Sequence, residues 1–222
     1  MNPHTLAAAA LIAALLIFLM VVLGSYLMVT GFAQGATLTD RGLRSLRYFT
    51  VQSNLLVGLS SLLYAVALIP VLRGRANGVP AALQILQLAA TASVGLTFLV
   101  VTGFFIPVLH SKDMFVGPNL WFHLVVPLAA IVSFPLLFRF APLPRSAILW
   151  SAVPMLLYGS FYTLNCLLRG TGDYQNPATL NDWYWFLHWG LPVGIAFFVG
   201  LCAVTMGLAA LLRAGNLHLP KK

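Results

Sequence analysis

Charged residues are scarce in this chain of 222 residues, which has 12 Lys and Arg, 4 Asp and Glu, and a charged fraction of 7%. A typical soluble domain is about 25% charged, whereas 60% of the residues here are hydrophobic, so a water-soluble globule is excluded. The formal net charge of +8 would suit a nucleic-acid binder. The cations, however, are scattered between apolar runs and form no stripe that could follow a phosphate backbone. We therefore expect no nucleic-acid partner.

The sequence also lacks N-x-[ST] sequons, an internal repeat, and short segments of alternating apolarity. The missing repeat argues against an inverted-topology transporter, and the missing alternation argues against a transmembrane β-barrel. Instead there are six apolar runs, each long enough to cross a hydrocarbon core of about 30 Å as a helix. The runs cover residues 6–30, 47–72, 80–109, 119–141, 146–168 and 185–212. We predict an all-α, polytopic membrane bundle of six transmembrane helices, forming a single domain over residues 1–222.

The placement of Lys and Arg predicts the orientation, because cytoplasmic loops are enriched in these residues. One side of the six-helix arrangement receives seven cations and no acid: Arg73, Arg75, Arg139, Arg145, Arg213, Lys221 and Lys222. The other side receives the remaining five cations and all four acids: Arg41, Arg44, Arg47, Lys112, Arg169, Asp40, Asp113, Asp173 and Asp182. We predict that both termini are cytoplasmic, with the basic tail facing membrane lipids.

Polar residues in the predicted helices recur at steps of three and four, as on one face of a helix. Because a polar side chain facing lipid is costly, these faces are expected to point into the bundle. Given the alternating helix directions, many of these residues reach the same extracytoplasmic leaflet: Thr50, Asn54, Thr102, Asn119, His123, Tyr162, Asn165, Arg169 and His188, with Asp182 in the loop before the last helix. Convergence at one depth predicts a site near the extracytoplasmic side.

The candidate nucleophiles in this leaflet are Thr50 and Ser53, and the candidate bases are His123 and His188. Thr50 and His123 each lie about one turn inside helices that enter from the same face. A hydrogen bond between the threonine hydroxyl and the imidazole is therefore feasible, as nucleophilic catalysis requires. The plainer interpretation is a capping or packing threonine and a hydrogen-bonded core histidine.

Two short motifs resemble those of the androgen-induced membrane protein family, whose members hydrolyse fatty acid esters of hydroxy fatty acids. Arg47-Tyr48-Phe49-Thr50 is similar to the family's basic-Tyr-apolar-Thr motif. Asn119 and His123, followed by a proline, are similar to its Asn-x-x-x-His motif. Residues 49–57 and 158–170 look more like the bacterial six-helix relatives of that family, and the resemblance runs in order through helices two to six.

The resemblance implies that Thr50 is the nucleophile, that His123 is its partner, and that a lipid ester from the bilayer is hydrolysed through an acyl-threonine without a cofactor. It also favours a bacterial inner membrane. The oxyanion needs fixed donors, for which Asn54, Asn119 and Arg169 are candidates. Asp182 or Asn165 would orient the imidazole by the logic of a catalytic triad, and His188 is a further supporting candidate.

Two other classes of function remain open. A zinc-dependent intramembrane hydrolase needs three protein ligands, and the residues available on the outer side are His110, His123, His188 and Asp182. The sequence contains no tight metal-binding motif among them, so we expect no bound metal. A non-catalytic membrane scaffold, lipid-binding protein or transporter is the other alternative. The sequence makes no prediction about oligomerisation.

Overall fold

The computed structural model describes residues 2–30, 42–109, 112–176 and 179–218, and in these ranges the chain is helical with no β-strand. Six helical stretches are long and apolar enough to span a membrane: Pro3–Thr30, Phe49–Leu72, Ala81–Phe105, Pro118–Leu137, Ala147–Arg169 and Leu191–Leu217. The predicted all-α bundle of six membrane helices is therefore confirmed.

The first two spans are single helices, α1 (Pro3–Thr30) and α2 (Phe49–Leu72). The third joins α3 (Ala81–Val100), the π-helical η2 (Val101–Phe105) and α4 (Ile106–Leu109). The fourth joins α5 (Pro118–Leu120), the π-helical η4 (Trp121–Val125) and α6 (Val126–Leu137). The last two are α7 (Ala147–Trp150) with α8 (Val153–Arg169), and α9 (Leu191–His218). Two short 3-10 helices, η1 (Gly42–Arg47) and η3 (Lys112–Phe115), precede spans two and four.

The two π-helical turns have a local cause. Each is followed closely by a proline, Pro107 after η2 and Pro127 after η4. A proline has no backbone N–H, so it cannot complete the α-helical hydrogen bond to the carbonyl four residues earlier. In the fourth span that carbonyl belongs to His123. The helix widens there, and such π-turns occur frequently at functional sites.

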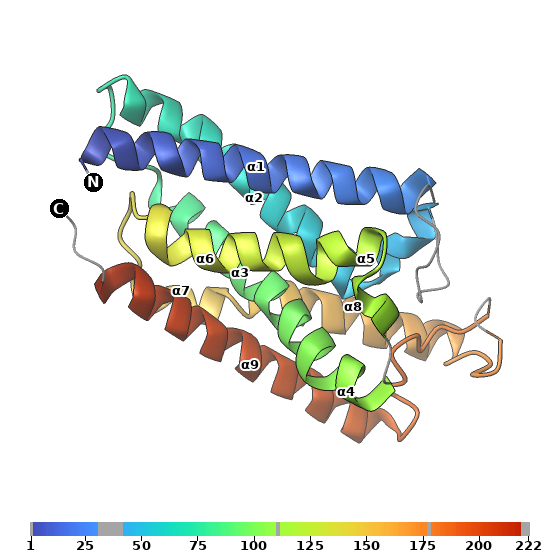
Figure 1. Cartoon of the computed structure of the whole chain (residues 1–222). Coiled ribbons are helices and arrows are strands. Elements are labelled where there is room, and N and C mark those ends of the chain that lie inside the picture. The colour runs from blue at the N-terminus through green and yellow to red at the C-terminus, as the bar shows by residue number, and fades with distance from the viewer. Residues whose placement is uncertain (1, 31–41, 110–111, 177–178, 219–222) are drawn as a thin grey trace.

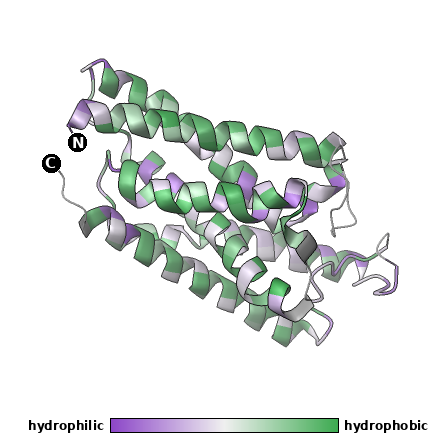
Figure 2. Cartoon of the chain, viewed as in Figure 1, coloured by the Kyte–Doolittle hydropathy of each residue, from purple (hydrophilic) through white to green (hydrophobic). Residues whose placement is uncertain are grey.

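The start of α1 and the end of α9 lie at the same end of the bundle (Figure 1). We call this the termini end; it also carries residues 73–80 and 138–146. The opposite end, the loop end, carries η1, η3 and residues 170–176 and 179–190 of the connection before α9. The α3 helix packs against α2, α6 and α9 and is the most buried of the six spans. Green, hydrophobic residues cover much of the helices in Figure 2, as lipid contact requires.

Small residues let the helices approach closely, the usual means of packing in membranes. A Cβ on Gly58 of α2 would lie 2.8 Å from Cγ1 of Val21 on α1, and one on Gly24 of α1 would lie 2.5 Å from the Phe122 ring. Both glycines therefore have no room for a side chain. These contacts fix α1 against α2 and η4, and so help to place the loop-end residues of three spans.

A network of buried amides stabilises the termini end. The Tyr64 hydroxyl donates to Gln84 Oε1, and Gln84 Nε2 donates to the Phe138 carbonyl at 2.6 Å. Asn216 Nδ2 donates to the same carbonyl at 2.7 Å. Four spans are thus joined at the point where the fourth leaves the bundle, with side-chain amides in place of the missing helical partners.

Three predicted boundaries are wrong by several residues. The fourth helix, predicted over 119–141, ends at Leu137 because Phe138 adopts a non-helical conformation (φ −87°, ψ 77°). The last helix, predicted over 185–212, begins at Leu191 and continues to His218. It begins late because Trp185 and Gly190 have positive φ values of 60° and 91° and hold residues 182–190 in turns.

Candidate functional site

Thr50 lies at the beginning of α2, as its second residue after the cap Tyr48. It is half-buried and lines a cavity of about 60 Å³ together with Thr97, Tyr158 and Tyr184. The first N–H groups of a helix have no partner within the helix. Among the hydrogen bonds of the described residues, none uses the Thr50 N–H. The nucleophile candidate therefore lies at the partially positive end of a helix dipole.

Tyr184 belongs to the connection before α9 and covers the beginning of α2. Its phenol oxygen accepts a hydrogen bond from the Phe49 N–H at 3.1 Å. Burial raises the pKa of Tyr184 to about 12, although hydrogen bonds with Phe49, Tyr158 and Thr50 act in the opposite direction. Tyr184 is therefore a neutral phenol near physiological pH, able to donate a proton into the space beside Thr50.

An aromatic cluster holds this connection on the motif that precedes Thr50. Trp183 Nε1 donates to the Tyr158 hydroxyl at 3.0 Å, and that hydroxyl donates to the Arg47 carbonyl at 2.9 Å. The Arg47 guanidinium lies 5.1 Å from the Trp183 ring centroid, a cation–π distance. Trp185 and Trp189 are exposed instead and suit an interfacial aromatic belt. The connection thus covers the beginning of α2 and also exposes two tryptophans that suit a membrane interface.

Asp182 also holds the connection before α9 in place, through the hydrogen bonds that it accepts. Its carboxylate is fully buried and accepts hydrogen bonds from the hydroxyls of Tyr162 and Tyr174 and from the Leu187 N–H. The Tyr162 oxygen in turn accepts from the Tyr184 N–H at 3.0 Å. Asp182 is therefore occupied with holding Tyr184 in place, and the structure does not bring it to His123 as the predicted orienting group.

His123 is 2% exposed and belongs to the π-helical η4. Its Nδ1 lies 2.8 Å from the Met114 carbonyl oxygen in η3. A carbonyl only accepts, so Nδ1 must carry the hydrogen and, in the neutral ring, Nε2 keeps its lone pair. The backbone of η3 thus performs the orienting role that the sequence analysis gave to Asp182 or Asn165, and it selects the tautomer that a general base needs.

Asn54 connects the two helices that carry the catalytic candidates. Its Nδ2 donates to the Thr50 carbonyl at 2.7 Å and to the Phe122 carbonyl at 3.0 Å. Both amide hydrogens are used, so Asn54 has none left for an oxyanion and acts as a positioning residue. Its Oδ1 is buried without a hydrogen-bond partner among the described residues.

The structure brings the helix turns of Thr50 and His123 together, but not their reactive atoms. Within the described ranges no hydrogen bond joins the Thr50 hydroxyl to the His123 ring. Thr50 faces the cavity beside Tyr184, while His123 is held by η3. In enzymes without substrate such catalytic hydrogen bonds are often long, and they shorten when the substrate binds.

The remaining predicted residues lie around this centre rather than in it. Asn119 is buried in α5, one turn before His123. Asn165 is half-buried on α8, and Arg169 is exposed at the end of that helix. His188 is exposed, with its ring 4.7 Å from that of Tyr174. Of these four residues, none lines the Thr50 cavity.

The predicted zinc alternative finds little support. In the described part of the chain, no three or more His, Cys, Asp and Glu residues form a group that could hold a metal ion. His123 is bound to Met114, Asp182 to two tyrosines, and His188 is at the surface. His110 lies outside the described residues.

Sequence reasoning missed Thr97, Tyr158 and Tyr184 as members of the site. Thr97 was missed because it lies on a long apolar helix. In the structure its hydroxyl oxygen lies 3.2 Å from that of Ser53. The signal for Tyr184 was the density of aromatic residues after Asp182, which also fits an interfacial belt.

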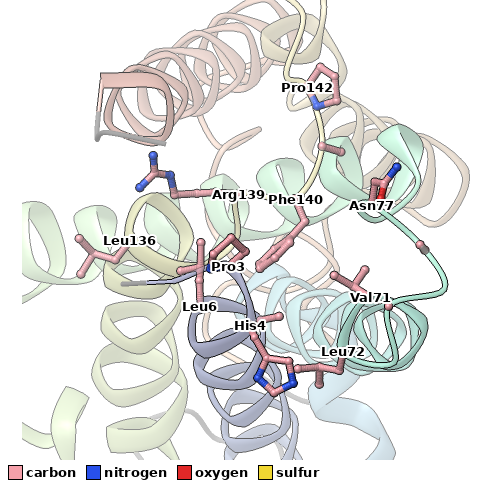
Figure 3. Close-up of a pocket in the computed structure, with 14 residues that line it drawn as sticks. Pro3, His4, Leu6, Val71, Leu72, Asn77, Leu136, Arg139, Phe140 and Pro142 are labelled. Atoms are coloured by element: carbon pink, nitrogen blue, oxygen red, sulfur yellow. The ribbon is translucent and has the colours of Figure 1, made fainter. Parts of the chain in front are cut away.

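A much larger hollow lies at the termini end, with a volume of about 820 Å³ (Figure 3). It is formed by the start of α1, the end of α2 and the end of α6. Figure 3 shows His4 and Arg139 among mostly apolar side chains. Its described lining includes one imidazole, that of His4, and no hydroxyl, thiol or carboxylate that could pair with it.

No protein family, curated protein or solved structure matched this chain when the comparisons were made. The resemblance to the androgen-induced membrane protein family therefore remains a prediction based on short motifs.

Proposed function

We propose that this chain is an integral membrane hydrolase of lipid esters, of the fatty acid ester of hydroxy fatty acid type, with Thr50 as nucleophile and His123 as general base. The observation that supports it best is the pair of hydrogen bonds made by Asn54. One reaches the carbonyl of Thr50 and the other reaches the carbonyl of Phe122, the residue before His123. A single side chain thus sets the register between the two helices that carry the reacting groups.

The state of His123 fits the role of base. Nδ1 is held by the Met114 carbonyl, which leaves the lone pair on Nε2. The ring is buried and cannot exchange this partner for water easily. Closure of the Thr50–His123 pair then requires a rotation of the threonine side chain toward the ring when an ester occupies the cavity.

The surroundings of Thr50 fit the role of nucleophile. The Thr50 N–H at the beginning of α2 offers a backbone donor, and the Tyr184 phenol offers a side-chain donor. Donors aimed at developing negative charge are typically worth about 100- to 1,000-fold in rate each. These two groups replace Asn54 as the oxyanion donors that we propose.

The reaction proceeds in two balanced steps. The Thr50 oxygen attacks the ester carbonyl while His123 accepts the threonine proton, and His123 then gives this proton to the departing alcohol. The acyl-threonine is hydrolysed by water, which His123 deprotonates before returning the proton to the Thr50 oxygen. A cavity of about 60 Å³ has room for a few water molecules.

Activity-based labelling tests the proposal. Purified wild-type protein should react with a fluorophosphonate probe, and Thr50→Val should not, since it removes the hydroxyl but keeps the shape. Thr91→Val is the matched control, because Thr91 is a buried threonine whose hydroxyl has no partner among the described residues. Equal labelling of wild type and Thr50→Val would refute the assignment of the nucleophile.

One observation favours the non-catalytic alternative, a lipid-binding membrane protein: the resting structure has no hydrogen bond between Thr50 and His123 in the parts that it describes. If wild type is folded, retains bound lipid and fails to react with a series of probes of different size, this alternative replaces the hydrolase. Turnover of a lipid ester by wild type but not by Thr50→Val would reject it.

A further inference from the structure

A groove of about 410 Å³ lies between α2 and α8, in the half of the bundle that contains Thr50. Its walls include Phe49, Ser53 and Leu56 from α2, and Pro154, Leu157 and Tyr158 from α8. The α2 and α8 helices contact each other only sparsely, which leaves this space open. Leu157 is 68% exposed, so the groove opens on the outer surface of the bundle, where lipid is expected.

The groove and the Thr50 cavity share two walls. Phe49 and Tyr158 line both, and their ring centroids are 5.2 Å apart. These two side chains are therefore the partition between the outer groove and the space beside Thr50. Because Tyr158 is anchored through its hydroxyl to Arg47 and Trp183, Phe49 is the wall with fewer polar constraints.

The volumes of the Thr50 cavity and the groove suggest that they hold different parts of one ligand. Pockets that enclose whole ligands usually measure about 300–1,000 Å³, so a cavity of about 60 Å³ can take only a small group such as an ester carboxyl. A long chain attached to that group must leave the cavity. The groove is the adjoining space that is large enough.

The surface of the groove suits a hydrocarbon chain. Its polar members make hydrogen bonds within the protein: the Gln52 Nε2 donates to the Leu46 carbonyl, and the Ser53 hydroxyl bonds with the Thr50 carbonyl and with Thr97. Phe49, Leu56, Pro154, Leu157 and Phe161 present carbon atoms. The lining of the groove is therefore mainly apolar and suits a hydrocarbon chain better than a polar headgroup.

We infer that the groove between α2 and α8 binds one fatty acyl chain of the ester substrate, which enters sideways from the bilayer and passes the Phe49–Tyr158 pair. This inference rests on the proposed function of Thr50. Lipid tails are as apolar as leucine, so burial in the groove gains little affinity. The groove acts by orientation: it aligns the chain so that the carbonyl arrives beside Thr50.

Chain-length selectivity tests this inference through turnover. Leu157→Trp places a large ring in the groove, while Leu156→Trp places the same ring on the neighbouring position of α8, which is 54% exposed and does not line the groove. We expect Leu157→Trp to lower the ratio of kcat/KM for a palmitate ester to that for an acetate ester by at least about tenfold, because a misplaced chain misplaces the carbonyl. Leu156→Trp should keep the wild-type ratio. The same ratio in both variants would overturn the inference.

A measurement without turnover separates the groove from the hydrolase. Palmitate carrying a terminal diazirine is photocrosslinked to the Thr50→Val protein in detergent, and the labelled peptides are mapped. Crosslinks within residues 49–56 and 154–161 that are lost in Thr50→Val/Leu157→Trp but retained in Thr50→Val/Leu156→Trp support the groove, even if wild type shows no esterase activity. Crosslinks spread over all lipid-facing helices, with no difference between the two double variants, would reject it.

Discussion

The two ends of the bundle differ in the kinds of polar side chains that they bury. At the termini end, Gln84 and Asn216 both donate to the carbonyl of Phe138, and the phenol of Tyr64 completes the network. These are amide and carbonyl contacts that join helix ends. The loop end also has a buried amide that joins two helices, Asn54, but it adds a carboxylate, phenols and an imidazole: Asp182, Tyr158, Tyr162 and His123.

The cavities at the two ends differ in volume, and the larger one is at the end with fewer kinds of reactive side chain. The termini end has the large hollow of about 820 Å³, and the loop end has a cavity of about 60 Å³ beside Thr50. Size alone would favour the first as the functional site. The chemistry favours the second, because there the first turn of α2, which carries the Thr50 hydroxyl, lies beside the turn that carries the fixed imidazole of His123.

Replacing His123 should have the largest effect and acts on the loop end alone. We expect His123→Gln to slow fluorophosphonate labelling by about 100-fold or more, the usual contribution of a general base. The exposed His188 provides the control His188→Gln, which should label at the wild-type rate. Labelling rates of both variants, measured at temperatures where circular dichroism shows them folded, decide the matter. Equal rates for the two variants would contradict the role of His123.

Replacing Gln84 tests the termini end in the opposite way. Gln84→Ala removes two buried hydrogen bonds and leaves a small cavity, so we expect a loss of stability of about 3 kcal/mol. The labelling rate of the folded fraction should stay at the wild-type value. Thermal unfolding in detergent measures the loss, and Gln52→Ala, on a more exposed glutamine, should cost much less. Slower labelling of folded Gln84→Ala would contradict the prediction that the termini end affects stability but not reactivity.

Asp182→Asn should loosen the connection that carries Tyr184. An amide in place of the carboxylate cannot accept all three hydrogen bonds from Tyr162, Tyr174 and Leu187, so we expect about 2 kcal/mol of destabilisation. Labelling should also slow, since the cover over Thr50 shifts. Limited proteolysis of residues 170–190 reports the loosening directly. Asp173→Asn, at an exposed aspartate in the same connection, is the control and should behave as wild type.

The smallest effect concerns alkaline pH. The pKa of Tyr184 is raised from 10.0 to about 12, so the folded protein holds this proton more tightly than the unfolded chain does. Its contribution to stability is complete below pH 10 and is lost as the pH rises through about 12. Thermal unfolding across this interval should fall less steeply for Tyr184→Phe than for wild type. Tyr26→Phe, at an exposed tyrosine, should match wild type.

The sequence was sufficient for the helices because each apolar run had to be satisfied by its own backbone hydrogen bonds in lipid. It was not sufficient for the beginning of α9. That boundary depends on residues 182–190, whose turns are stabilised by the buried carboxylate of Asp182 and its hydrogen bonds with Tyr162 on α8 and Tyr174 in the connection. These contacts join residues 20 and 8 positions apart and leave no periodic pattern.

The candidate site shows the same limit. Helical periodicity predicted that Thr50, Asn54 and His123 share a leaflet, and the structure places their helices side by side through Asn54. Periodicity did not predict that the backbone of η3 orients the imidazole, or that Tyr184 lies beside the threonine. Both depend on loop conformation, which a polar or aromatic composition does not specify.

The widened turns before Pro107 and Pro127 have one more consequence. A π-turn amounts to one extra residue inserted into a helix, so the segments on its two sides are rotated by about 100° relative to an unbroken helix. Removing a single residue from η4 would restore a regular α-helix in the fourth span. The His123 imidazole would then be rotated away from its present neighbours, while α6 kept its packing. A change of one residue in η4 can thus alter which side chains face the interior at the loop end without disturbing the packing at the termini end.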